Sequence, residues 1–434
     1  MRIQRNYSKS IFNERKRRKE LGVRVLLYIF LLIGFIAIID NQFSQLQLVA
    51  LQFVGQAPAP TPFASELANE GMQRYASGNL RDALNLLQRA VQQQPNNVDY
   101  LYEYGKLLLE MGDIEPRFYG EAVSVGDQAI NTNPNDPRGY TLKARALTLS
   151  GDPAGSIPIA QSGLMVNRSF APLYAALSDA YRRIDRYDVA IENAEHAVEL
   201  DPLDPYARRI YSYALTWVGR FDESIYQLEQ AIMLNPHLAG PYFELAGLYR
   251  YQAQQAQDTQ FALERYADSI ALYEQVIALQ PENARAYLRL CEVYFEAQEN
   301  VRATDYCLDA TRLDPNYMEA WASLGQTQYS RRNFEGAIES LERCATLGGE
   351  QADLRCYYIR GLAHFYLGNC DNAWSILTYS LNRIRAGNPD PDNTVLLNIE
   401  FGIRLIIDNC AAYRNELFPT SVPPTAIPPT LIGG

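Results

Sequence analysis

The sequence has few of the residues from which catalytic and metal-binding sites are built. Its 434 residues include only 3 histidines, His196, His237 and His364, which lie far apart along the chain. The G-x-x-x-x-G-K-[ST], G-x-S-x-G, H-E-x-x-H and C-x-x-C motifs are all missing, so the common phosphate-loop, hydrolase, metalloprotease and thiol-redox sites are excluded. We therefore expect no catalytic residues, no metal, no cofactor and no enzymatic activity.

Long apolar runs are equally scarce, and the one that stands out is "VLLYIFLLIGFIAII" at residues 25–39. The 24 residues before it contain nine Lys or Arg and two Glu, and so carry a charge of +7. Because the formal net charge of the whole chain is −11, the residues that follow carry −18. Basic residues directly before an apolar run are typical of a cytoplasmic N-terminus. We predict a single-pass membrane protein of bacterial type whose remaining chain is periplasmic or extracellular.

A helix of fifteen residues spans about 22 Å, less than the hydrocarbon thickness of about 30 Å. Extension back to Leu21, with Arg24 reaching the headgroups, closes this gap. A cleaved signal peptide is the main alternative, but small residues at alternate positions do not follow closely enough for cleavage. We favour an uncleaved signal-anchor, and we expect no nucleic-acid partner for the basic segment.

The rest of the chain is repetitive, as its prolines show. The separations between successive prolines of the series are 39, 68, 34, 45 and 34 residues. The proline series is Pro95, Pro134, Pro202, Pro236, Pro281 and Pro315. The basic step is 34, because 68 is two steps with Arg168 at the missing proline, whereas 39 and 45 include insertions of 5 and 11 residues.

Within each step the order of residue types is also preserved. In one unit Tyr174, Leu177, Ser178 and Tyr181 precede Ala190, Ala197 and Pro202, and in another Trp321, Leu324 and Gly325 precede Phe334, Ala337, Leu341 and Cys344. This order resembles the tetratricopeptide repeat (TPR) family, whose pattern is W-x2-L-G-x2-Y followed by A, F and P. The resemblance covers about residues 64 to 383. Its eight units begin near Ser65, Val98, Pro137, Ala171, Pro205, Ala239, Ala284 and Met318, and a degenerate ninth begins after Leu354.

The resemblance implies an all-α fold, a right-handed TPR α-solenoid of about nine helix-turn-helix repeats with its first helices on the concave face. Apolar residues at i, i+3, i+4 and i+7 independently predict two amphipathic helices per unit. Glycines at 78, 112, 151 and 219 stand where each first helix must turn. The predicted organisation is 1–24 basic cytoplasmic segment, 25–39 transmembrane helix, 40–63 linker, 64–383 solenoid, 384–418 capping-helix region and 419–434 Pro/Thr-rich disordered tail.

Six cysteines all lie downstream of the membrane segment, and an even count there suggests disulfides in an oxidising compartment. Cys291 and Cys307 occupy inward positions on the two helices of one unit and should face each other. Cys344 lies on a second helix whose neighbour carries Cys356, which leaves Cys370 for Cys410. Buried free thiols are the alternative interpretation.

The concave face of the fourth to sixth units is the candidate binding site. Spacings of three and four place a set of arginines and aromatics on one stripe of each first helix. The set is Arg182, Arg183, Arg209, Tyr213, Trp217, Phe243, Arg250 and Tyr251. Such residues often anchor protein contacts, so the expected partner is a protein or peptide, with an acidic peptide as one candidate. The alternative is that these residues pack among themselves. The Gln-rich insertion 251–266 forms either a wall of this groove or only a longer helical hairpin.

We therefore predict a non-enzymatic, membrane-anchored scaffold that binds a partner protein or peptide for assembly of an envelope complex. The carboxylate clamp of the family, which pairs Lys and Asn, is absent, because Ala175 and Asp179 stand at the corresponding places. An alternative is an accessory subunit that binds an envelope polymer or glycan on Tyr213, Trp217, Phe243 and Tyr251. A structural wall-spanning role for the tail is a further alternative.

Overall fold

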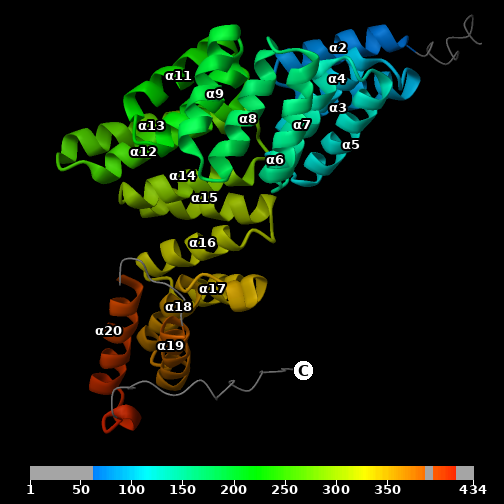
Figure 1. Cartoon of the computed structure of the whole chain (residues 1–434). Coiled ribbons are helices and arrows are strands. Elements are labelled where there is room, and N and C mark those ends of the chain that lie inside the picture. The colour runs from blue at the N-terminus through cyan, green and yellow to red at the C-terminus, as the bar shows by residue number, and fades with distance from the viewer. Residues whose placement is uncertain (1–61, 387–393, 417–434) are drawn as a thin grey trace, which may run out of the picture. The chain divides into compact units, whose positions relative to one another are not determined.

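The structure, a computed structural model, describes residues 62–386 and 394–416. The predicted basic segment, transmembrane helix and Pro/Thr-rich tail, and all but the last two residues of the predicted linker, lie outside these ranges. Within them we find no helix that combines the length and the apolar character needed to cross a bilayer. The described part is all-α and consists of helix pairs that follow one another along the chain, with α20 beside α18 and α19 (Figure 1).

The first helix of each pair begins within one residue of the predicted start. These helices are α2 (Ala64–Ala76), α4 (Val98–Gly112), α6 (Pro137–Leu149), α8 (Ala171–Arg183), α10 (Pro205–Trp217), α12 (Ala239–Gln255), α14 (Ala284–Glu296), α16 (Met318–Ser330) and α18 (Arg355–Tyr366). Four of them, α4, α6, α10 and α14, start at a polar cap; the Asp136 and Asp204 side chains, for example, accept hydrogen bonds from the first turns of α6 and α10. Pro137 and Pro205 follow these caps, where a missing N–H costs nothing.

The second helices pack against the first through small residues. They are α3 (Leu80–Gln93), α5 (Arg117–Thr132), α7 (Pro153–Val166), α9 (Tyr187–Leu200), α11 (Phe221–Leu234), α13 (Thr259–Leu279), α15 (Asn300–Leu313), α17 (Phe334–Gly348) and α19 (Cys370–Arg385). In α9 the buried residues are all alanines, Ala190, Ala194 and Ala197. Because these side chains are short, the paired backbones come close, and the prediction of an all-α helical repeat solenoid is confirmed.

Turns between paired helices use a left-handed residue, which is glycine at Gly78, Gly151, Gly219 and Gly368. In other units Asp185, Gln298 and Arg332 take the same backbone conformation, with φ near 60°. Gly112 was expected to have this role, but it is the last residue of α4 and its φ is not positive. A Cβ there would lie 2.1 Å from the Tyr119 ring, so this glycine is required for close packing instead.

The insertion in the sixth unit lengthens its helix pair. Helix α12 continues to Gln255, and α13 spans 21 residues from Thr259, capped by Asp258. Residues 251–266 therefore fold mainly as a longer helical hairpin. Two of them, Tyr251 and Gln254, also line a cavity described below, so both interpretations of the insertion apply in part.

Contacts between distant units close one superhelical turn. Arg81 of α3 forms an ion pair with Glu282, which lies 201 positions along the chain in the turn between α13 and α14. Gly78 lies close to Leu279, since a Cβ on it would be 3.7 Å from that side chain. Arg209 of α10 also reaches Asp113 at the end of α4, 3.6 Å away. We refer to these three as the closing contacts, and to α2 through α14 as the closed turn.

From α14 onward, three cysteine pairs lie at disulfide distance. The Sγ atoms are 1.97 Å apart in Cys291–Cys307, 1.94 Å in Cys344–Cys356 and 1.96 Å in Cys370–Cys410. These are the three pairs expected from the sequence. They join α14 to α15, α17 to α18, and the start of α19 to the residue that follows α20 (Thr394–Asn409).

Helix α20 covers the end of the solenoid. Its buried residues Ile399, Ile403 and Ile406 pack with Leu377 and Leu381 of α19. Gly402 allows this approach, because a Cβ there would lie 2.8 Å from Leu362 of α18 and 2.9 Å from Leu377. The helix therefore provides the apolar surface that a tenth repeat would otherwise supply.

Candidate functional site

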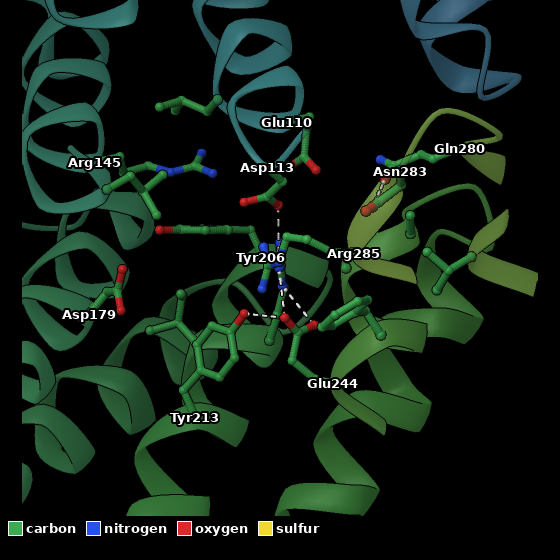
Figure 2. Close-up of a pocket in the computed structure, with 18 of the residues that line it drawn as sticks. Glu110, Asp113, Arg145, Asp179, Tyr206, Tyr213, Glu244, Gln280, Asn283 and Arg285 are labelled. Atoms are coloured by element: carbon green, nitrogen blue, oxygen red, sulfur yellow. Dashed lines mark hydrogen bonds and ion pairs between the residues drawn. The ribbon is translucent and has the colours of Figure 1, made fainter. Parts of the chain in front are cut away.

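The closed turn surrounds a cavity of about 350 Å³, which we call the central cavity. Its lining comes mainly from α4, α6, α8, α10 and α12, with further residues from α5, α13, α14 and the turn between α13 and α14. Four residues of the predicted binding set line it, namely Arg183, Arg209, Tyr213 and Phe243. Figure 2 shows that acidic side chains, including Glu110, Asp113 and Glu244, share the cavity with them.

Arg209 is held on both sides by carboxylates. Its Nε and Nη2 donate to the two oxygens of Glu244 at 3.1 and 2.9 Å, and Asp113 lies 3.6 Å from Nη2. The Tyr213 hydroxyl donates to the same Glu244 carboxylate. Burial opposes the charge of Arg209, but Glu244 and Asp113 outweigh it and hold its pKa well above the usual value. Gly240 leaves room for this arrangement, since a Cβ there would lie 2.2 Å from the guanidinium carbon.

The two neighbouring arginines are also paired within the chain. Arg182 donates to Asp179 at 2.6 Å, and Arg183 lies 3.4 Å from the same carboxylate. Asp179 itself is 3% exposed, so its charge is compensated by the two guanidinium groups instead of by water. Of these two arginines only Arg183 lines the central cavity.

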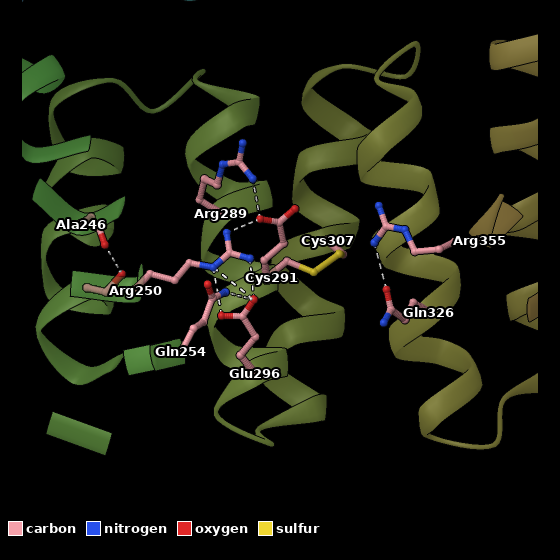
Figure 3. Close-up of polar contacts among 11 residues, drawn as sticks. Ala246, Arg250, Gln254, Arg289, Cys291, Glu296, Cys307, Gln326 and Arg355 are labelled. Atoms are coloured by element: carbon pink, nitrogen blue, oxygen red, sulfur yellow. Dashed lines mark hydrogen bonds and ion pairs between the residues drawn. A yellow bond between two sulfur atoms is a disulfide. The ribbon is translucent and has the colours of Figure 1, made fainter. Parts of the chain in front are cut away.

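A second cavity of about 470 Å³, the side cavity, adjoins the first and shares Phe243 and Glu244 with it. Arg250 and Tyr251 of the predicted set lie in its wall. Arg250 pairs with Glu292 and Glu296 of α14, at 2.5 Å to each. Figure 3 shows Arg250 directed at Glu296, with Gln254 beside them. Carboxylates therefore hold this arginine too.

Two aromatics of the predicted set are openly exposed. Trp217 is 59% exposed, stacks on Tyr187 with ring centroids 5.6 Å apart, and lines neither cavity. Tyr251 is 42% exposed, and its ring lies 5.0 Å from Phe221. Phe243, in contrast, is partly buried and presents its ring against Tyr273. The structure thus brings most of the predicted set to two adjoining cavities, but leaves Arg182 and Trp217 outside them.

Sequence reasoning missed the acidic partners Asp113, Glu244, Glu292 and Glu296. Arg145 and Tyr206, which also line the central cavity, were missed as well. Glu244 follows Phe243 on the same first helix as Arg250, so the stripe pattern that selected the arginines could have selected it. In the part of the chain that the structure describes, no group of His, Cys, Asp and Glu is arranged to hold a metal ion.

This architecture defines a helical repeat protein, in which paired helices stack into a solenoid around a concave, ligand-sized cavity. Family models of the tetratricopeptide repeat match residues 74–146, 171–202 and 260–327. Together with the fold, these matches support a solenoid built of tetratricopeptide repeats in the described part of the chain. Such repeats are typically non-enzymatic scaffolds that bind partner proteins, and the comparisons identify no catalytic domain.

A curated relative is similar over a short stretch only. The small glutamine-rich tetratricopeptide repeat-containing protein 2 of Mycosarcoma maydis is 31% identical over 84 residues, which are 19% of this chain and 24% of that protein. The chain therefore spans about a quarter of the length of this relative.

Solved structures share the fold at low identity. A chain of the APC/C hetero-tetramer Cut9–Hcn1 has a TM-score of 0.56 at 16% identity, and the match covers 74% of this chain and 59% of that one. The human IFIT1 dimer with m7Gppp-AAAA has a TM-score of 0.53 at 13% identity, with 81% and 96% covered. At these identities the likeness concerns the solenoid fold alone.

Proposed function

We propose that this protein is a membrane-anchored scaffold that binds a segment of a partner protein in its central and side cavities. The observation that supports this most directly is the pair of adjoining cavities on the first-helix face, which share Phe243 and Glu244. Their volumes of about 350 and 470 Å³ suit a few residues of an extended segment. Tetratricopeptide repeats typically bind other proteins, and the two cavities are the proposed binding site.

The internal ion pairs change the chemistry expected of the partner. Arg182, Arg183, Arg209 and Arg250 already pair with carboxylates of the chain, so a partner acid would have to compete with them. We propose that contacts with this set come mainly from apolar area and hydrogen bonding, with the half-exposed ring of Tyr251 as an anchor.

The proposed location is an oxidising compartment outside the cytoplasm, with the chain anchored by residues 25–39. The three cysteine pairs at disulfide distance support this proposal, because disulfides are rare where thiols are kept reduced. The basic segment before the apolar run supports a cytoplasmic N-terminus. A role in assembling an envelope complex of bacterial type follows from this location.

The test is capture of the partner from mildly solubilised membranes by the full chain, with quantitative mass spectrometry. We expect Tyr251→Ser to reduce the captured partner by about tenfold, since truncation of an interface aromatic often costs more than 1 kcal/mol. The matched control is Tyr226→Ser on the outer helix α11, which removes a tyrosine that is 54% exposed and lines neither cavity. Equal loss of the partner in both variants, or in neither, would contradict binding in the cavities.

The polymer-binding alternative requires open aromatic faces. Phe243 packs against Tyr273, the Tyr213 hydroxyl is bonded to Glu244, and only Trp217 and Tyr251 of the four are exposed. We therefore favour the protein-binding role. Retention of the native chain on isolated envelope polymer, lost with Trp217→Ala, would instead favour the alternative.

A further inference from the structure

Two guanidinium groups that line the central cavity, those of Arg145 and Arg285, form no ion pair among the described residues, and only that of Arg145 is buried, since Arg285 is exposed. Arg145 of α6 is 8% exposed, and its Nε is buried without a hydrogen-bond partner. The guanidinium lies over the ring of Tyr206, 3.5 Å from the ring centroid. Among the described residues no carboxylate forms an ion pair with it, in contrast to Arg209 on the same cavity wall.

Arg145 lies where two cavities meet. Together with Glu110 and Tyr206 it lines both the central cavity and a further cavity of about 540 Å³ that extends toward the starts of α8 and α10. Figure 2 shows Arg145 and Glu110 directed into the central cavity from different helices, with the Tyr206 ring beneath the guanidinium. A ligand group can therefore reach Arg145 from the space on either side.

Arg145 keeps its charge in this setting. Burial opposes the charge, but the neighbouring Tyr206 and Glu110 outweigh it and raise the pKa of Arg145 above its usual value. A buried, unpaired guanidinium destabilises a fold unless an anion reaches it. The guanidinium is planar and stacks on the Tyr206 ring. Two of its N–H groups can donate parallel hydrogen bonds to the two oxygens of one carboxylate.

We propose that Arg145, supported by Tyr206, binds a single carboxylate that enters the central cavity. The carboxylate belongs to a side chain or chain end of the partner segment, or to a small free acid. This inference rests on the proposed function and deepens it, because it names the chemical group recognised by a residue outside the predicted set.

The surrounding charge selects a carboxylate over a more highly charged group. Glu110, Asp113, Asp179 and Glu244 line the same cavity, and Asp204 lines the adjoining one. The guanidinium groups of Arg183 and Arg209 are already paired. A phosphate dianion or a nucleic-acid strand would bring more negative charge than Arg145 can offset, beside Glu110 and Asp204, which form no ion pair among the described residues. One monoanion matches the single charge of Arg145.

The experiment titrates the detergent-solubilised full chain with defined probes by isothermal calorimetry. The probes are acetyl-Ala-Ala-Glu-Ala-amide, its Gln analogue, acetyl-tetraalanine with a free carboxylate, succinate and inorganic phosphate. We expect at least one carboxylate probe to bind, and the Gln peptide and phosphate to bind about tenfold more weakly, as expected for loss of a charge-assisted hydrogen bond. Whether a peptide or succinate binds more tightly distinguishes a partner segment from a free acid.

Arg145→Met keeps an unbranched apolar stem at this position and removes the guanidinium group with its charge. We expect it to bind the preferred probe about tenfold more weakly or worse. The control Arg89→Met makes the same charge change at an exposed position on α3 and should bind as the native chain does. Without ligand, the thermal midpoint of Arg145→Met should equal or exceed that of the native chain, because an unpaired buried charge has been removed.

Several results would overturn the inference: unchanged probe binding by Arg145→Met, tighter binding of phosphate than of every carboxylate, or no probe binding to the native chain. A lower thermal midpoint of Arg145→Met together with intact binding would assign Arg145 a purely structural role. Capture of the partner separates the two proposals. If Tyr251→Ser loses the partner while Arg145→Met retains it, the scaffold function stands and the carboxylate site does not.

Discussion

At the scale of single residues, the main result is that the concave face is electrically balanced from within. The arginines that suggested an acidic partner meet acids of neighbouring units: Arg209 meets Glu244, 35 positions away, and Arg250 meets Glu296, 46 positions away. Spacing within one helix shows which residues share a stripe, but it does not show what faces them from the next unit. The stripe was therefore predictable from the sequence, whereas the neutralisation of its charge was not.

The partly buried side chain of Glu110 leads to a pH-dependent prediction. Burial raises its pKa in the folded state, and the nearby Arg209 lowers it only in part. Below the unfolded-state pKa of about 4.3, both states are protonated and the group favours folding most. As the pH rises through the folded pKa, this contribution is lost, because the unfolded state ionises more readily.

Replacing Glu110 by Gln removes this titration. We expect the thermal midpoint of Glu110→Gln, relative to that of the native chain, to be higher at pH 7 than at pH 4. Melting curves of both proteins across this range provide the measurement, with the exposed Glu335→Gln as a control for loss of a surface carboxylate. A difference between Glu110→Gln and the native chain that stays constant with pH would show that Glu110 does not titrate abnormally.

At the scale of helices, the sequence predicted most of the architecture. Helix starts follow caps and prolines that are read locally, as at Asp136–Pro137 and Asp204–Pro205, and the pairing partners are adjacent in the chain. The second unit is instructive, because Gly112 looked like a turn residue but is needed for the Tyr119 ring. Turns also tolerate Asp185, Gln298 and Arg332 in a left-handed conformation, so glycine alone does not mark them.

The cap provides a prediction at this scale. Cys370 and Cys410 enclose a separation of 40 residues, and the loop-entropy model gives about 4 kcal/mol for such a cross-link. We expect Cys370→Ser/Cys410→Ser to accelerate hydrogen exchange in α20 and α19 while leaving α2 to α6 unchanged. The comparison is Cys291→Ser/Cys307→Ser, which should affect α14 and α15 first. Uniformly faster exchange along the chain would contradict a local stapling role.

At the scale of the whole solenoid, the closing contacts set this chain apart from a simple linear array. In such an array each repeat contacts only its neighbours, so a local defect fades from unit to unit. Here Arg81 and Gly78 of the first unit meet Glu282 and Leu279, five units further along. No repeat-by-repeat pattern indicates this closure, because it depends on the accumulated curvature of the units and on the two insertions.

Closure predicts long-range coupling of stability. Leu87 of α3 is 1% exposed, and its truncation to alanine should cost about 2–5 kcal/mol. We expect Leu87→Ala to increase hydrogen exchange in α2 and α3 and also in the turn between α13 and α14. Leu341→Ala in α17, an equally buried position beyond the closed turn, should instead affect only nearby helices. Unchanged exchange at the α13–α14 turn in Leu87→Ala would show that the closing contacts carry no coupling.

The closed turn also affects the residence time of a bound partner segment. A segment inside the central cavity would be encircled by the closed turn, α2 through α14. It would dissociate either along the axis of the turn or after the ion pair between Arg81 and Glu282 has opened. Departure would then be timed by the opening of the ring as well as by the strength of the contacts inside it. A closed ring of this kind can therefore give a long residence time even when the individual contacts with the bound segment are weak.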